Sequence, residues 1–444
     1  MRLLRKTGQV LTICFALPAL GCGSSEDSAP QTPHAGAACD TTRRPLVFVH
    51  GTVGSGDNFS HPALLLASNG YCADRIHAIE YNSLGGGYAD AAAKLDELIP
   101  KVLAETHADK VDLLGHSQGA GHGVRYAGEH PDRIAHYIHL AGGPVAENPG
   151  GVPTLSIAST GDAIAKGCCD NTSISKSVVF QDVNIDHFAV AASTESFIEI
   201  YKFLNDGKEP AHLEVEPEDQ ITLYGRGITF GDSQIVEGAT IEVYELGSDA
   251  RQRGAPVQSF NVPADGFVGP WLALAGVAYE FKLIAPAGDT RLPRHFYPRP
   301  FKRSNRLLRF LFQSQNTLAS NSTNAVNYSD EHAVFVARHS RGAFLFGRDE
   351  LSVDGFQALN DQNAIPANTV VGLYMFDNSL TAEDGPGNGV SEGGAAIKGA
   401  FVSSSDVFIP AITPAFSIVK YNDQELKVPN WPSASDGLSI LFFD

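Results

Sequence analysis

The stretch KVDLLGHSQGA, residues 110–120, decides the fold. Its first half is apolar on consecutive residues, which is typical of a strand buried on both faces of a parallel sheet. Its second half contains Gly115-His116-Ser117-Gln118-Gly119, a match to G-x-S-x-G, and a helix is expected from about Gln118 to Glu129. The pattern predicts a tight turn from strand to helix that exposes the Ser117 hydroxyl at the edge of the sheet.

A second match to the same pattern occurs near the C-terminus. Gly389-Val390-Ser391-Glu392-Gly393 lies in the glycine-rich tract EDGPGNGVSEGGAA. No strand enters this tract and no apolar helix leaves it, so we interpret it as a loop. The context therefore selects Ser117 as the candidate nucleophile.

Strand-like and helix-like runs alternate on both sides of Ser117. The strand-like runs are PLVFVHG (45–51), RIHAIEYNS (75–83), IAHYIHLAGG (134–143), PTLSIAST (153–160) and SVVFQDVN (177–184), and the helix-like runs include 89–108 and 195–206. This order predicts a doubly wound, mostly parallel α/β sheet over residues 44–207.

A serine hydroxyl becomes nucleophilic when a base lies within hydrogen-bond reach and a third group orients that base. His187 follows the strand-like run 177–184 and precedes the last helix, and Asp162 follows the run 153–160, so both fall at the sheet edge where active sites gather. We therefore predict a catalytic triad of Ser117, His187 and Asp162. The residues weighed against them are Asp170, Asp182 and Asp186 for the acid, and His122, His130, His136 and His139, interpreted as structural, for the base.

Acyl transfer also needs hydrogen-bond donors aimed at the developing oxyanion. His50-Gly51 ends the first parallel strand, and in this kind of site the backbone N–H after that pair and the N–H after the nucleophile commonly serve. This predicts an oxyanion hole formed by Thr52 and Gln118. The alternative interpretation of residues 50–52 is a plain strand-ending turn.

Residues 45–205 resemble the minimal bacterial lipase type of α/β-hydrolase, on the motifs VFVHGT, LLGHSQGA, STGD and IDHF. The resemblance implies an acyl-enzyme mechanism in which His187 takes the Ser117 proton, Asp162 orients His187, and water deacylates the serine. The layout of the whole chain is similar to that of archaeal and bacterial lipases with a C-terminal β domain thought to bind lipid.

After Asn205 the sequence changes to β-branched and aromatic runs broken by Gly, Pro, Asn and Asp, which predicts an all-β region. We place a β-sandwich domain at 214–290 and a C-terminal β domain at 291–444. The alternative is that the second part completes the first into one larger unit. The basic and aromatic stretch from Arg291 to Phe312 either meets anionic lipid or pairs with the protein's own acidic groups.

The N-terminus reads as an export signal. Arg2, Arg5 and Lys6 precede an apolar run that is too short to span a membrane, which predicts a signal peptide over residues 1–21 and a flexible tether over 22–43. Ala19-Leu20-Gly21-Cys22 resembles a lipoprotein cleavage site with Cys22 as a lipid anchor, and it also suits ordinary signal peptidase. We therefore predict a bacterial protein that is secreted or held on the outer surface.

Export makes disulfides plausible for the remaining cysteines. Cys39, Cys72, Cys168 and Cys169 allow three pairings, and we favour Cys39 with Cys72, because the adjacent Cys168 and Cys169 cannot pair without strain.

The formal net charge of −18 argues against nucleic acid as a partner. The sequence contains no metal-ligand spacing, phosphate loop or dinucleotide fingerprint, so we predict no cofactor and no metal. The apolar run from His61 to Ala67 is a candidate lid or an ordinary packed helix.

The prediction is thus a triacylglycerol lipase or carboxylesterase that acts on apolar acyl esters. The alternatives are an extracellular polyester depolymerase with the same triad and a non-catalytic surface binding protein.

Overall fold

The computed structural model describes residues 39–166, 173–314, 325–378, 387–391, 397–399, 401–412 and 415–444. These residues lie within one compact unit, Ala35–Asp444. The predicted signal peptide, Cys22, Cys168, Cys169 and Asp170 lie outside the described residues.

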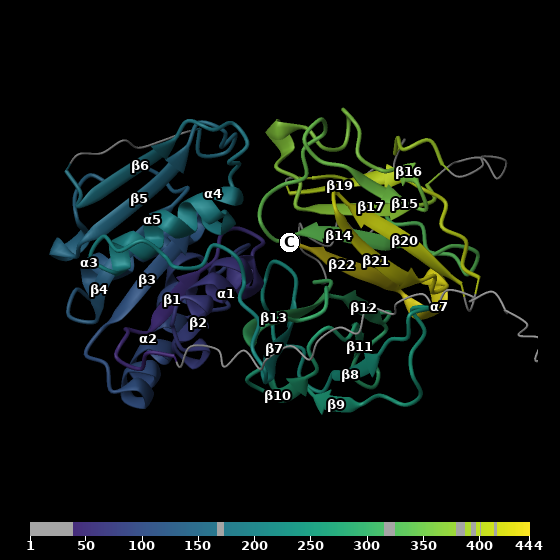
Figure 1. Cartoon of the computed structure of the whole chain (residues 1–444), viewed down its shortest axis with the longest axis horizontal. Coiled ribbons are helices and arrows are strands. Elements are labelled where there is room, and N and C mark those ends of the chain that lie inside the picture. The colour runs from purple at the N-terminus through teal and green to yellow at the C-terminus, as the bar shows by residue number, and fades with distance from the viewer. Residues whose placement is uncertain are drawn as a thin grey trace, which may run out of the picture. The chain divides into compact units, whose positions relative to one another are not determined.

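The first part of the chain forms a six-stranded sheet in the order β2-β1-β3-β4-β5-β6 (Figure 1). Its strands are β1 (Leu46–Val49), β2 (Ile76–Ala78), β3 (Val111–His116), β4 (Ile134–Leu140), β5 (Thr154–Ser159) and β6 (Lys176–Phe180). Every neighbouring pair is parallel. This confirms the predicted doubly wound α/β sheet. Each predicted run contains its strand except the last, because β6 begins at Lys176, one residue before the run 177–184.

Helices cover both faces of this sheet. Successive side chains of a buried strand point to opposite faces, so apolar side chains on both faces pack against helices. Val47 and Val49 of β1 pack in one core with residues of α2 and α3, whereas Leu46 and Phe48 pack in a second core with residues of α1 and α5. The helices are α1 (Ser60–Ser68), α2 (Gly87–Thr106), α3 (Gln118–Glu129), α4 (Ala189–Ala192) and α5 (Thr194–Leu204), with 3₁₀ turns η1 (Gly56–Phe59), η2 (Ala73–Arg75) and η3 (Pro149–Gly151).

The apolar run from His61 to Ala67 belongs to α1. Leu65 and Leu66 are fully buried in the core on the α1 and α5 face of the sheet. The structure therefore makes this run a packed helix, which was the second of the two interpretations.

The rest of the chain is β-rich and forms three further sheets, with the orders β10-β7-β13, β18-β19-β17-β14-β22-β12-β11-β8-β9 and β16-β15-β20-β21. The strands are β7 (Ile221–Thr229), β8 (Thr240–Glu245), β9 (Gln258–Asn261), β10 (Phe267–Ala273), β11 (Tyr279–Ile284), β12 (Arg294–Tyr297), β13 (Asn305–Phe312), β14 (Phe335–His339), β15 (Leu351–Val353), β16 (Phe356–Gln357), β17 (Gly372–Phe376), β18 (Lys398–Gly399), β19 (Val402–Asp406), β20 (Phe416–Tyr421), β21 (Gln424–Pro429) and β22 (Leu438–Phe443). A 3₁₀ turn, η4 (Pro366–Asn368), and a short helix, α7 (Ser433–Asp436), complete the region.

Strand pairing crosses the boundary that the sequence suggested at residue 290. β12 pairs with β11 on one side and with β22 on the other, and β13 pairs with β7. One hydrophobic core also includes Phe281, Phe310 and Ile440. Residues on both sides of 290 therefore share a sheet and a core.

Three arginines of the basic stretch from Arg291 to Phe312 pair with acidic groups of this chain. Arg291 bonds to Asp289, Arg303 lies 3.8 Å from Glu218, and Arg309 pairs with Glu80 of the α/β domain. Both members of the Arg309–Glu80 pair are buried, and the Glu80 carboxylate also accepts the N–H of Gly56. At these three arginines the structure matches the internal-pairing interpretation.

Cys39 and Cys72 form a disulfide, which confirms the favoured pairing.

No helix among the described residues is both long enough and apolar enough to cross a bilayer.

We expect Arg309→Met to lower the free energy of unfolding by about 3 to 5 kcal/mol, because it leaves the Glu80 carboxylate charged and buried without its partner. The double variant Arg309→Met/Glu80→Gln should recover part of this loss. Guanidinium unfolding measures both. The control is Arg125→Gln, which removes an exposed pair with Glu129 and should leave the unfolding midpoint unchanged. An Arg309→Met protein that unfolds like the wild type would contradict the expectation.

Candidate active site

Ser117 lies on a sharp turn between the end of β3 and the start of α3. Its backbone angles are φ 55° and ψ −120°, in a region that residues with a side chain rarely occupy. Such strain persists only where the surrounding structure enforces it, and it gathers at functional sites. The turn is the strand-to-helix elbow that the sequence predicted.

The two glycines of the motif are required by close backbone contacts. A Cβ at Gly119 would lie closer than 3.0 Å to the carbonyl oxygens of Val49 and His50, and one at Gly115 would be equally close to the backbone of Gly119. Real Cβ atoms essentially never come so near. The elbow can therefore sit against the end of β1 only with glycine at position 119, and the start of α3 can lie against the end of β3 only with glycine at position 115.

The structure brings Ser117, His187 and Asp162 into one hydrogen-bonded line. His187 Nε2 lies 2.9 Å from Ser117 Oγ, and His187 Nδ1 lies 2.8 Å from Asp162 Oδ2. His187 and Asp162 are both buried. The residues come from the turn after β3, the loop after β6 and the loop after β5, which meet because the sheet is parallel. The line has the geometry of a nucleophile, its base and an orienting acid.

Asp162 is held as a carboxylate. Burial opposes its ionisation, but the hydrogen bond and charge of His187 and the backbone N–H groups of Ala165 and Ile164 together lower the pKa of Asp162. Both N–H groups donate to Oδ1 at 2.8 Å, which leaves Oδ2 for His187. Oδ1 thus binds the backbone of its own loop, and Oδ2 binds the His187 ring and fixes its orientation.

His116, the residue before the serine, supports the same loop. Its Nε2–H donates to the carbonyl oxygen of His187 at 2.8 Å. Burial, assisted by the charge of His187, lowers the pKa of His116 to about 3, so the ring is neutral. No local sequence pattern assigns this role to His116, because only the tertiary contact reveals it.

The loop after β1 lies directly against Ser117. A Cβ on Gly51 would lie 2.8 Å from the Cβ of Ser117. Thr52 Oγ1 donates to Gln118 Oε1 at 3.2 Å, so the two residues predicted for the oxyanion hole are joined to each other. Gln118 is also the first residue of α3, and the N–H groups of a first helical turn have no partner within the helix.

Buried groups behind this loop, also without a role in the sequence analysis, fix its path. The Tyr81 hydroxyl donates to the His50 carbonyl oxygen at 2.9 Å, and the two rings stack with centroids 4.5 Å apart. Burial lowers the pKa of His50, which keeps the ring neutral. These contacts of Tyr81 and His50 therefore fix the backbone that leads to Thr52.

The other residues considered for the acid and the base lie on other elements or form other hydrogen bonds. Asp182 bonds within its own turn to Asn184. His122 lies on α3, and His130 ends that helix. His136 bonds to Asp112 at 2.8 Å, and His139 bonds to the Gly143 carbonyl oxygen. Ser391 is buried in a part of the C-terminal β-rich region without regular structure.

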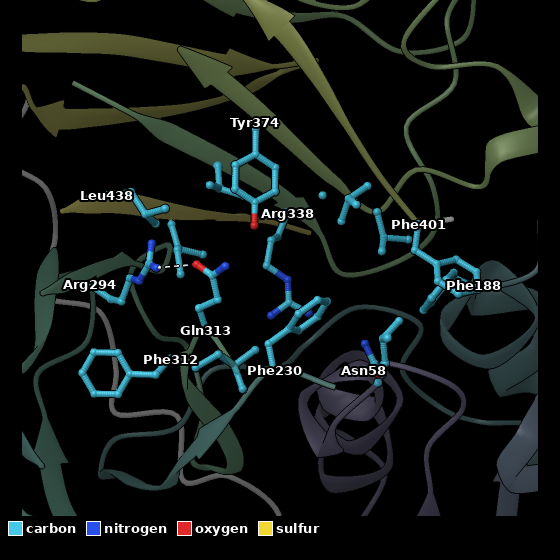
Figure 2. A pocket seen from close by; sticks show the side chains of 18 residues that line it. Asn58, Phe188, Phe230, Arg294, Phe312, Gln313, Arg338, Tyr374, Phe401 and Leu438 are labelled. Atoms are coloured by element: carbon cyan, nitrogen blue, oxygen red, sulfur yellow. Dashed lines mark hydrogen bonds between the residues drawn. The ribbon is translucent and has the colours of Figure 1, made fainter. Parts of the chain in front are cut away.

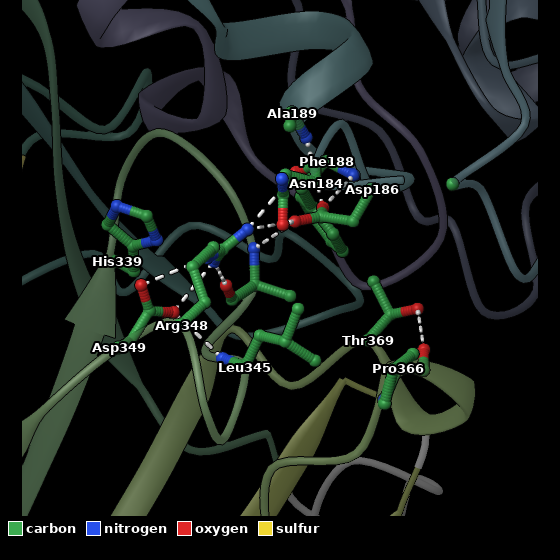
Figure 3. A network of polar contacts seen from close by, with 12 residues as sticks. Asn184, Asp186, Phe188, Ala189, His339, Leu345, Arg348, Asp349, Pro366 and Thr369 are labelled. Atoms are coloured by element: carbon green, nitrogen blue, oxygen red, sulfur yellow. Dashed lines mark hydrogen bonds and ion pairs between the residues drawn. The ribbon is translucent and has the colours of Figure 1, made fainter. Parts of the chain in front are cut away.

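Asp186 precedes His187 but points away from it. Its Oδ1 accepts the N–H groups of Phe188 and Ala189, and its Oδ2 accepts the N–H of Ala343 from the β-rich region at 2.9 Å. Arg348 lies 3.9 Å from the same oxygen and donates to the Asn184 carbonyl oxygen (Figure 3). The β-rich region therefore holds the loop that carries His187, a contact between segments far apart in the sequence.

A pocket with mostly apolar walls lies beside these loops (Figure 2). Val53 and Gly54 of the loop after β1 line it, as does Phe188, whose ring contacts those of His187 and His116. Phe401 of the β-rich region packs edge-on against Phe188. The pocket thus joins the candidate site to the β-rich region.

Among the residues that the structure describes, no three His, Cys, Asp or Glu side chains gather in a way that would hold a metal ion.

Comparison with known families agrees with this architecture. Residues 44–157 match the family described as alpha/beta hydrolase fold, residues 219–315 match the lipase C-terminal domain, and residues 323–444 match a third family described as a C-terminal domain. The chain therefore contains an α/β-hydrolase fold, followed by a region that matches a lipase C-terminal domain and by further β structure.

Several solved hydrolases are similar to part of the chain. Naproxen esterase from Bacillus subtilis shares 14% identity, with 38% of this chain and 86% of its own covered, at a TM-score of 0.28. A carboxylesterase from the same organism shares 11% identity, with 38% and 87% covered, at 0.29. A pyrethroid hydrolase shares 14% identity, with 36% and 98% covered, at 0.30.

Gly119→Ala should disrupt the elbow, because the added methyl group collides with the Val49 and His50 carbonyl oxygens. We expect a loss of at least about 2 kcal/mol in the free energy of unfolding, in the range of other strained core substitutions. The matched control is Gly121→Ala on the same helix, where a Cβ meets nothing within 4 Å. It should raise stability by about 0.5 to 1 kcal/mol through helix propensity. Equal effects of the two substitutions would refute the steric argument.

The neutral His116 should make the protein sensitive to acid. Its folded pKa of about 3 is below that of the unfolded chain, so between these values only the unfolded chain binds the proton. Stability from this group is complete above the unfolded pKa and falls by about 1.4 kcal/mol per pH unit as the pH drops toward the folded pKa. His116→Gln, which keeps a donor for the His187 carbonyl, should therefore lose less stability between pH 7 and pH 5. Guanidinium unfolding at several pH values tests this, and parallel pH profiles would contradict it.

Proposed function

We propose that this protein is a carboxylic-ester hydrolase that cleaves apolar acyl esters through a covalent intermediate on Ser117. The observation that carries the proposal is the hydrogen-bonded line from Asp162 through His187 to Ser117, with separations of 2.8 and 2.9 Å. A domain without catalytic activity has no physical need for this line on a strained turn.

The first half of the proposed reaction acylates the serine. Ser117 Oγ attacks the ester carbonyl carbon while its proton passes to His187 Nε2, and Asp162 stabilises the resulting imidazolium. The carbonyl oxygen becomes an oxyanion, which accepts hydrogen bonds from the backbone N–H groups of Thr52 and Gln118. Collapse of this intermediate breaks the bond to the alcohol, which leaves with the proton held on His187.

The second half returns the serine. Water gives a proton to His187 Nε2 and attacks the acyl carbon, and the same two N–H groups stabilise the second oxyanion. Cleavage of the bond to Ser117 Oγ then releases the carboxylic acid, and the proton on His187 returns to the serine. Asp162 remains ionised throughout, in agreement with its lowered pKa.

The preference for apolar acyl groups rests on the pocket beside the site. Its walls near the triad are formed by Phe188, Val53 and Gly54, and Phe401 continues them into the β-rich region. An alkyl chain would be removed from water there, which favours binding in proportion to the apolar area buried. The match of residues 219–315 to a lipase C-terminal domain supports the same substrate class.

We also propose that the protein is exported, with Cys22 as a lipid anchor. The basis is the signal-like sequence of residues 1–21. The disulfide between Cys39 and Cys72 supports the proposal, because disulfides persist mainly in oxidising compartments.

Ser117→Ala should lower kcat for p-nitrophenyl esters by about 10⁶-fold, as removal of a serine nucleophile does in other triads. The series should run from short to long acyl chains, so that its profile also reports the preferred acyl length. Ser391→Ala is the matched control, since it removes the serine of the second G-x-S-x-G match, and it should retain wild-type activity. Full activity of Ser117→Ala would refute the assignment, and a wild type that hydrolyses no ester would favour a binding protein.

A further inference from the structure

The pocket beside the triad contains a buried arginine that is not paired with any carboxylate of the described residues. Arg294, at the start of β12, is 7% exposed and lines the pocket. Its guanidinium donates to the side-chain oxygen of Gln313 at 3.3 Å, and it forms no ion pair with any of the described acidic residues. Arg338, which lines the same pocket, differs because it bonds to Asp57 at 2.8 Å.

The surroundings of Arg294 are mostly apolar. Figure 2 shows its guanidinium beside Gln313, with Phe312 and Leu438 close by and the Tyr374 hydroxyl directed toward Arg338. Leu311, Val336 and Ile440 also line the pocket. Burial raises the pKa of Tyr374 to about 12, partly offset by the charges of Arg294 and Arg338, so this phenol stays protonated and remains a hydrogen-bond donor.

A cation in such surroundings is costly unless an anion meets it. A buried charge loses its hydration, and one neutral hydrogen bond to Gln313 returns only part of that loss. The guanidinium is a planar fork of donors that matches a carboxylate, which can accept two parallel hydrogen bonds. The apolar walls, in contrast, suit an alkyl chain. The pocket thus offers a binding site for an anionic head group and an apolar wall for a hydrocarbon tail, and both suit one ligand.

We propose that this pocket binds an alkyl carboxylate, with its head on Arg294 and its chain along the apolar wall toward Phe188. An alkyl carboxylate is the acid that ester hydrolysis would release, so the choice of this anion rests on the proposed function. The carboxylate then lies away from Ser117, in the reverse direction to an acyl chain on the serine, so the acid binds as a released product that has turned round and occupies the pocket.

Calorimetric titration with decanoate tests the proposal on the Ser117→Ala protein, so that binding is measured without turnover. We expect Arg294→Met to weaken decanoate binding by about thirtyfold or more, as loss of one partner from a buried charge pair does. Decanol, which has the same chain without the charge, should bind weakly and equally to both proteins. The matched control is Arg299→Met, which changes an arginine of a neighbouring pocket and should leave decanoate affinity unchanged.

A second variant distinguishes loss of the binding site from misfolding caused by the substitution at position 294. Gln313→Glu places a carboxylate of the chain itself where Arg294 already donates a hydrogen bond, so it should keep the fold and also abolish decanoate binding. Decanoate affinity that survives both substitutions, or that equals the affinity for decanol, would overturn the proposal. Decyl sulfate binding as tightly as decanoate would assign the pocket to alkyl anions in general and overturn the preference for a carboxylate.

The two proposals fail in different ways. If the wild type hydrolyses no ester but decanoate still binds through Arg294, the pocket is a ligand site and the proposed activity is wrong. If esters are hydrolysed but decanoate does not bind, the activity stands and this inference falls.

Discussion

The close approach of the Ser117 turn to the end of β1 is the constraint on which the rest of the site depends. Gly119 lets the start of α3 lie against the carbonyl oxygens of Val49 and His50, and Gly115 lets the end of β3 lie against the backbone of Gly119, at distances that no side chain would permit. This contact sets Ser117 beside Gly51, and so beside the loop that carries Thr52. Parallel pairing of β3, β4, β5 and β6 then brings Asp162 and His187 to the same edge.

The β-rich region contributes structure to this site as well as a separate fold. It supplies Arg309 to the buried Glu80 carboxylate, and it supplies the Ala343 N–H and the Arg348 charge to Asp186, in the loop that carries His187. Phe401 meets Phe188 across the pocket. A hydrolase domain and a lipid-binding module that merely shared a chain would not need these buried polar contacts. The walls of the candidate site therefore come from both the α/β domain and the β-rich region.

Neutral histidines are a recurring element of the α/β domain. Burial lowers the pKa values of His50 and His116, and each ring bonds to a backbone carbonyl oxygen of a loop at the site. Uncharged imidazoles can be buried at less cost than charged groups and still direct a hydrogen bond. The polar framework around Ser117 is thus assembled without adding positive charge next to His187.

Local patterns in the sequence were sufficient for the six parallel strands, the elbow and the choice of Ser117, Asp162 and His187 as candidates, because strand hydrophobicity, glycine spacing and position after a strand are encoded by neighbouring residues. The Cys39–Cys72 pairing was a preference among three possible pairings, and the structure confirms it. The roles of Asp186, Arg348 and Arg294, and the continuity of sheet and core across residue 290, required the tertiary structure. Each depends on which residues meet from distant parts of the chain, and no short-range pattern specifies such meetings.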